Sequence, residues 1–298
     1  MKVIQEKIYN YIILLSFLAL IAALSLMPEI LQVIALLGIF SFGILHGSND
    51  LFVLQNLNQK NKQNDFWKAL FTYLGVVLSF VVVFYVIPLF ALLAFILISA
   101  YHFGEQHFHL KIRHQNSALA SLFYFVYGNL VLFLLFYFNK SEVVSIIFDM
   151  TAYTIPDPAF SVVLIVSGLT TIALYVFLSQ SNPKLKSSAL ADIFYLGLFS
   201  VLFSVSNVIW GFATYFVLWH SLPSLRDQVN SLYGRFNFSN FKNYFKKAFP
   251  YWLASIIGMA VLVFLFKDSK NFLSLLFAFI AAITFPHVFV MRKLFDKN

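Results

Sequence analysis

The sequence predicts an all-α protein, a polytopic transmembrane bundle of about ten helical spans. Of its 298 residues, 61% are hydrophobic and only 11% are charged, which excludes an ordinary water-soluble globule. Several apolar stretches reach about 18 residues or more, enough to cross ~30 Å of hydrocarbon. No change in composition marks a second domain, so we expect residues 1–298 to form a single integral-membrane domain.

We expect the spans at 8–27, 30–53, 69–87, 89–106, 118–138, 160–180, 188–205, 207–224, 250–266 and 271–291. The first is too long for the core of a signal peptide, and no small-residue cleavage site follows it. The stretch 188–224 is too long for one crossing, so a turn is expected at Ser204–Asn207. Prolines, whose missing N–H is tolerated at helix ends, fall at or near four breaks: Pro28, Pro88, Pro183 and Pro250.

The distribution of basic residues predicts the orientation. If the N-terminus is cytoplasmic and the spans alternate, only Lys140, Lys267 and Lys270 of the 20 lysines and arginines lie outside. This asymmetry predicts N-in and C-in, an even number of spans and a multi-pass protein of the cell inner membrane. The longest loops are 139–159 and 225–249; the second is basic and aromatic and is expected on the cytoplasmic interface. Because the loops account for the net charge of +8, we expect no nucleic-acid partner.

Four histidines lie within apolar stretches, where an ionisable side chain indicates a function. They fall on the second, fourth, eighth and tenth expected spans, at positions 17, 14, 14 and 17 from each start. Their heights then differ by only ~5 Å. One buried histidine more often forms a hydrogen bond to a neighbouring helix, but four at one depth favour a shared metal site. The four expected ligands are His46, His102, His220 and His287.

The chemistry of the donors narrows the choice of metal. The chain has no cysteine, and imidazoles without thiolate suit iron, copper or zinc. Zinc usually takes mixed ligands or three histidines with water, so an all-histidine site in a membrane favours iron and oxygen chemistry, although ligand type alone does not decide.

Two carboxylates accompany these histidines. Asp50 lies four residues after His46, so both are expected on one helix face, and its carboxylate could accept the N–H of a ligand imidazole. The alternative is a helix-end aspartate that faces interfacial water. Glu105, three residues after His102, invites the same interpretation. His107 is a reserve ligand, but with His109 and His114 it is expected at the membrane interface.

At these residues the chain resembles the Brp/Blh family of membrane β-carotene 15,15′-dioxygenases. The matching pieces are His46-Gly-Ser-Asn-Asp50, Tyr101-His-Phe-Gly-Glu105, Trp219-His220 and Phe285-Pro-His287. The resemblance implies that His46, His102 and His220 bind Fe(II), with Asp50 in support. It also implies that O₂ cleaves the central double bond of β-carotene to give two all-trans-retinal, a product that a rhodopsin could receive.

The chain departs from the family's pattern at one position. In many members a second histidine follows, one helical turn after the histidine that corresponds to His220. In this chain that position is Ser224, and Pro223 precedes it. Three outcomes follow: His287 supplies the fourth ligand, the metal keeps three histidines and an open position, or the activity is lost or changed. The depth of His287 favours the first.

A second class of function stays open. The chain could be a non-catalytic carotenoid- or retinal-binding membrane protein, or a small-solute transporter. A transporter should show internal repeats and helix breaks at the midplane, and the sequence shows no clear repeat.

Overall fold

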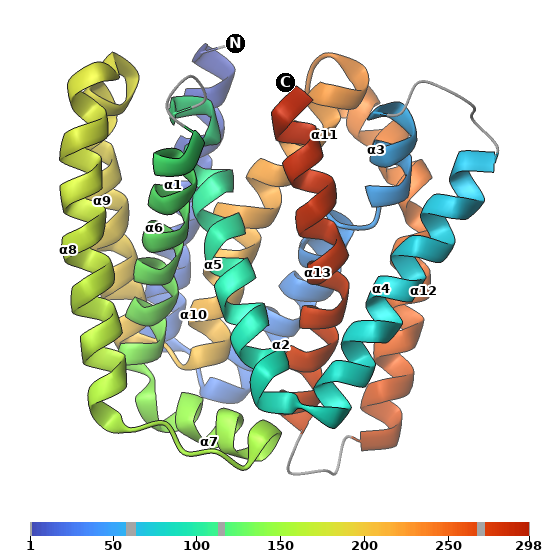
Figure 1. The fold of residues 1–298 in the computed structure, drawn as a ribbon, viewed down its shortest axis with the longest axis horizontal. Coiled ribbons are helices and arrows are strands. Elements are labelled where there is room, and N and C mark those ends of the chain that lie inside the picture. Colours follow the sequence, from blue (N-terminus) through green and yellow to red (C-terminus); the bar gives the residue numbers. More distant parts are fainter. Residues whose placement is uncertain (1, 58–63, 113–116, 267–271, 298) are drawn as a thin grey trace. The chain divides into compact units, whose positions relative to one another are not determined.

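The structure is a computed structural model that describes residues 2–57, 64–112, 117–266 and 272–297, and every element in these ranges is a helix (Figure 1). The all-α expectation is therefore confirmed. The helices are α1 Lys2–Ser25, α2 Pro28–Gly38, α3 Asp50–Leu57, α4 Asn64–Val86, α5 Pro88–Ile112, α6 Ser117–Phe138, α7 Lys140–Thr151, α8 Asp157–Ser181, α9 Pro183–Val205, α10 Val208–Thr214, α11 Leu222–Tyr233, α12 Phe238–Phe266 and α13 Phe272–Lys297. Two π-helical segments join them, η1 Ile39–Gly43 and η2 Tyr215–Ser221.

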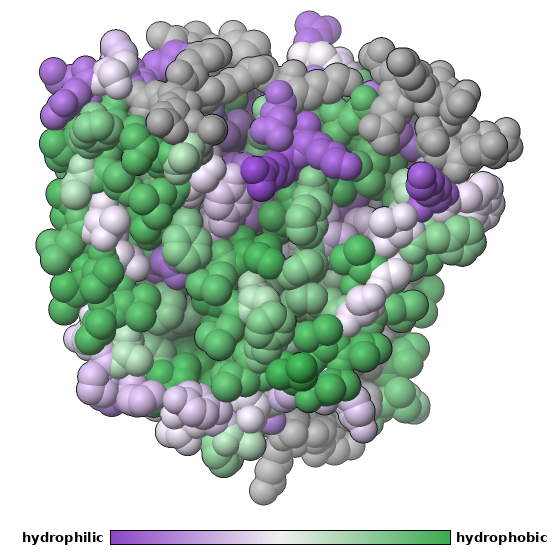
Figure 2. All heavy atoms as spheres, viewed as in Figure 1, coloured by the Kyte–Doolittle hydropathy of each residue, from purple (hydrophilic) through white to green (hydrophobic). Residues whose placement is uncertain are grey.

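Seven of the described helices are long and apolar enough to cross a membrane: α1, α4, α5, α6, α8, α9 and α13. Large apolar side chains on several of them are exposed, such as Tyr85 and Leu190. Hydrophobic residues also cover much of the face drawn in Figure 2. Apolar surface of this extent fits contact with lipid. The number of ten spans and the orientation stay predictions.

Local chemistry explains most helix ends. Pro28, Pro88 and Pro183 are each the first residue of a helix, where the fixed φ suits the first turn. Asn182 caps α9 by accepting hydrogen bonds from the next turn's N–H groups, and Asn207 caps α10 in the same way. The turn expected at Ser204–Asn207 is thus confirmed.

Three expectations about the loops and breaks were wrong. Pro250 lies inside α12 and does not interrupt it; a proline removes one helical hydrogen bond and need not end a helix whose other bonds persist. The expected loop 225–249 is mostly helical, because α11 extends to Tyr233 and α12 begins at Phe238 after a turn in which Gly234 has φ of 81°. The expected loop 139–159 contains α7.

The second expected span, 30–53, is not one helix. α2 passes into the π-helical η1, and a turn at 46–49 precedes α3. The backbone of this turn is tightly wound, since Gly47 N–H bonds to Ile44 O and Asp50 N–H to Gly47 O, both at 3.2 Å. A second π-helical segment, η2, carries His220. His46 and His220, two of the expected ligands, therefore lie where the regular α-helix is interrupted. π-helical segments are frequent at functional sites.

The chain divides into two compact units, each assembled from separate stretches of sequence. Unit 1 comprises Met1–Ile39, Ala100–Val144 and Ile155–Ser221. Within it α6 packs on α8 and α9, and α1 packs on α9 and η2. Phe123, Tyr127, Phe199 and Phe203 are almost fully buried there and form much of its core.

Unit 2 comprises Phe40–Ser99, Ser145–Thr154 and Leu222–Asn298. Within it α13 packs on α3, α4 and α12, and α11 packs on α3 and α12. One cluster of its core joins Phe80 of α4 to Ala281 and Ala282 of α13, with Phe285 against it. The small alanines let the two helices approach closely.

Two glycines allow a close helix crossing in unit 1, between α5 and α6. A Cβ at Gly104 would overlap the backbone carbonyl of Tyr124, and a Cβ at Gly128 would overlap that of Ala100. We expect Gly104→Ala to destabilise the protein by about 1–3 kcal/mol, because backbone atoms cannot move aside as a side chain can. Thermal unfolding in detergent measures this. Gly197→Ala is the control, since a Cβ there would meet no side chain or neighbouring helix within 4 Å, and equal stability of the two variants would contradict the prediction.

Candidate metal centre

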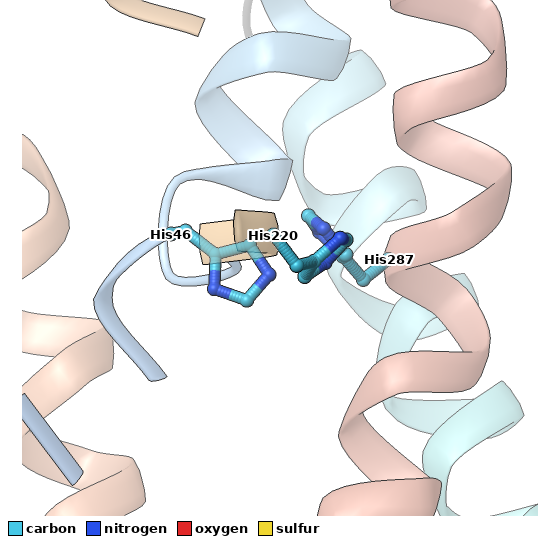
Figure 3. Close-up of side chains that lie close together, drawn as sticks. All are labelled: His46, His220 and His287. Carbon is cyan, nitrogen blue, oxygen red and sulfur yellow. The ribbon is translucent and has the colours of Figure 1, made fainter. Parts of the chain in front are cut away.

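Two of the expected ligands form a pair within unit 2. His46 lies in the turn before α3 and His287 lies on α13, and Figure 3 draws both side chains. Their ring centroids are 4.7 Å apart and the rings meet edge to face at 88°. Both are buried, with 4% and 2% of their surface exposed. Gly47 lies directly beside His287, since a Cβ there would be in ordinary contact with its Nδ1, at 3.6 Å.

Asp50 holds the ring of His287. Its Oδ1 lies 2.8 Å from His287 Nδ1, and its Oδ2 accepts a 3.0 Å hydrogen bond from the hydroxyl of Tyr73. The carboxylate selects the tautomer with hydrogen on Nδ1, which leaves the lone pair on Nε2. Asp50 was expected to share a helix face with His46; that was wrong, because the turn at 46–49 interrupts the helix.

The other two expected ligands form a pair within unit 1. The ring centroids of His102, on α5, and His220, on η2, are 4.8 Å apart, at an interplanar angle of 77°. They are 0% and 2% exposed. Phe103 and Phe216 pack against His220, with ring centroids 4.7 and 5.6 Å away, so this pair has an apolar wall.

Glu105 lies beside this pair but is not placed as Asp50 is. Its Oε2 is 4.0 Å from His102 Nδ1, longer than a hydrogen bond, and its Oε1 accepts a 2.9 Å hydrogen bond from Tyr101. The carboxylate is buried, at 5% exposed. Glu105 can therefore influence His102 electrostatically at this separation.

His107, which was expected at the membrane interface, is buried inside the protein. It is 7% exposed, and its Nε2 lies 3.8 Å from Asp192 of α9, which also pairs with Lys111. α5 continues to Ile112, and Asp192 supplies a partner charge to His107 from another helix. His109 is half-buried, and His114 lies outside the described residues.

Ser224, at the position of the departure from the family's pattern, is fully buried in unit 2. Its hydroxyl donates to the sulfur of Met291 at 3.9 Å and accepts from Gln228 Nε2 at 3.3 Å. A serine hydroxyl is a poor substitute for imidazole as a ligand to iron, copper or zinc.

The donor set fits a metal ion. Within unit 2, His46 and His287 each offer one ring nitrogen from a buried side chain, and within unit 1 His102 and His220 do the same. Neutral imidazoles are common ligands of iron, copper and zinc, and the carboxylate on His287 Nδ1 is the outer partner that metal-bound histidines usually have. Tyr73 completes this arrangement and was missed by sequence reasoning, because nothing in its spacing links α4 to Asp50.

Comparison with known proteins gives one match. A family model described as beta-carotene 15,15'-dioxygenase matches residues 37–295, a range that includes all four histidines, Asp50 and Glu105. No curated protein and no solved structure matches the chain.

Proposed function

Because the chain belongs to the β-carotene 15,15′-dioxygenase family, and is thus an enzyme of carotenoid cleavage, we propose that it acts through Fe(II) bound by histidines. The proposed reaction cleaves the central double bond of β-carotene with O₂ and gives two all-trans-retinal. Each oxygen atom of O₂ ends in one of the two aldehydes. The observation that carries the proposal is the family match over residues 37–295.

The proposed ligands are His46, His102, His220 and His287. Their burial and their pairing within each unit support this assignment, as do the donor chemistry and the contact of Asp50 with His287. Iron, when bound, supplies the reaction with O₂ that no amino-acid side chain performs. Asp50 keeps the Nε2 of His287 available as the ligand atom, and Tyr73 keeps Asp50 oriented.

The surrounding residues suit an apolar polyene. Phe103 and Phe216 line the His102 and His220 pair, and such rings would exclude water from the double bond being cleaved. The chain is a membrane protein with several apolar helices, so β-carotene dissolved in the bilayer is a substrate it can meet directly. We place the enzyme in the cell inner membrane, with transfer of retinal to a rhodopsin as the proposed fate of the product.

The test is expression in a bacterium that makes β-carotene. We expect the cells to lose colour and to accumulate retinal, two molecules for each β-carotene consumed. Cells that contain the folded protein but keep their carotenoid would contradict the activity. Longer aldehydes in place of retinal would show cleavage away from the central bond. A non-catalytic carotenoid binder or a transporter, the alternative class, would change neither colour nor product.

A further inference from the structure

The turn that carries His46 is held from outside by two side chains of unit 2. Gln228, on α11, donates from Nε2 to the backbone carbonyl of His46 at 2.7 Å. The hydroxyl of Tyr244, on α12, lies 3.2 Å from the same carbonyl and 3.4 Å from that of Leu45. All of these groups are buried, with Gln228 and Tyr244 at 0% exposed.

The two side chains also orient each other. The Tyr244 hydroxyl lies 2.9 Å from Gln228 Oε1 and can donate to it. With its oxygen turned to Tyr244, the amide of Gln228 presents its two N–H groups to the His46 carbonyl and to Ser224 Oγ, at 2.7 and 3.3 Å. Each amide atom thus faces a complementary partner, so one orientation of Gln228 is fixed.

The far end of the turn is tied to the same helix. Asn49 donates from Nδ2 to the backbone carbonyl of Tyr244 at 3.0 Å. Leu45 and Tyr244 belong to one apolar cluster with Leu225, Val229 and Ala248. The turn is therefore bracketed by hydrogen bonds before and after Gly47, and its apolar side packs on α11 and α12.

This arrangement matters because a turn has fewer backbone hydrogen bonds than a helix to fix its residues. A buried carbonyl must be satisfied, and here the His46 carbonyl accepts from Gln228 Nε2, a side chain distant in sequence that the Tyr244 hydroxyl in turn orients. When the peptide after His46 rotates, the imidazole moves with it. A ligand geometry that must hold to within about 0.5 Å needs such supporting contacts.

We propose that Gln228 and Tyr244 are positioning residues for His46, which fix its backbone carbonyl and thereby aim its imidazole at the metal. This inference rests on the proposed function, since it assumes that His46 is a ligand. Gln228 and Tyr244 touch neither substrate nor metal in this role.

Cobalt titration of the purified, metal-free protein tests the proposal. Co(II) reports ligand geometry through its visible absorption, and no turnover is needed. We expect Tyr244→Phe and Gln228→Met to weaken Co(II) binding by about tenfold or more and to alter the spectrum, as loss of an outer partner typically costs 10–100-fold. Both substitutions keep side-chain size and remove only the polar contacts.

Trp252→Phe is the matched control. Trp252, also on α12, donates from Nε1 to the carbonyls of Phe40 and Ser41 at 2.9 and 3.3 Å, in the same segment but away from the turn. The Trp252→Phe variant should bind Co(II) with an affinity within about threefold of that of the unsubstituted protein and give the same visible spectrum. Thermal unfolding of all three metal-free variants shows how much of any loss comes from stability alone.

The outcomes are distinguishable. If the unsubstituted protein binds Co(II) and His46→Ala does not, but Tyr244→Phe and Gln228→Met bind normally, the positioning role is wrong and the metal site stands. The positioning role would also be wrong if Trp252→Phe lost as much Co(II) affinity as Tyr244→Phe and Gln228→Met. If the unsubstituted protein binds no more Co(II) than His46→Ala, the proposed site fails and this inference fails with it. Should Gln228→Met not fold, Tyr244→Phe decides.

Discussion

Replacing His46 or His220 by alanine is expected to reduce β-carotene cleavage below about 1% of the unsubstituted rate. These two histidines come from different units, and each is a proposed ligand. Loss of a partner outside the ligand set typically costs 10–100-fold, and loss of a ligand itself should exceed that. Retinal production by purified protein supplied with Fe(II) and β-carotene in detergent is the measurement.

His109→Ala is the control for these variants. His109 lies on α5 beyond the paired histidines, is half-buried, and contacts the backbone carbonyls of Glu105 and Gln106. It should retain most of the activity. If His46→Ala or His220→Ala retains activity comparable to His109→Ala, the ligand assignment is wrong.

The second large effect is expected for Asp50→Asn. An asparagine fits the same space, but it lacks the charge that favours hydrogen on Nδ1 of His287, and its own amide N–H can favour the opposite tautomer. We expect metal affinity to fall by about 10–100-fold, with a matching loss of activity at limiting iron that excess iron partly restores. Metal competition with a chelator measures the affinity.

Asp192→Asn separates this effect from general loss of a buried carboxylate. Asp192 also lies beside a histidine, His107, but its close partner is Lys111 and it belongs to unit 1. Its replacement should lower stability, because it leaves a partly buried lysine without its ion pair. Metal affinity should stay near that of the unsubstituted protein. If Asp192→Asn weakens metal binding as much as Asp50→Asn, the specific role of Asp50 beside His287 is wrong.

The sequence contained most of the helical pattern. Apolar runs of sufficient length, some with prolines at their ends, predicted the positions of α4, α5, α6, α8 and α9 to within six residues at either end. The same patterns could not reveal the turn at 46–49. A glycine and a serine after His46 are compatible with a helix or a turn, and contacts from α11 and α12 select the turn.

The position of each histidine along its expected span predicted part of the candidate site. The shared level of the four residues suggested that their rings could meet, and within each unit two of them do. Asp50 contacts an expected ligand, His287, but its shared helix face with His46 was wrong, because a spacing of four residues places two side chains together only within an unbroken helix. Tyr73, Gln228 and Tyr244 carried no local signal, since each acts through contacts distant in sequence.

We propose that His46, His102, His220 and His287 together bind one iron ion, and metal content tests this proposal most directly. Iron bound to the purified, reconstituted protein should reach about one equivalent per chain, and His46→Ala and His220→Ala should each lose nearly all of it. Two equivalents in the unsubstituted protein, with one retained in each variant, would instead show a separate metal for each histidine pair. Full retention of iron in either variant would contradict the shared site outright.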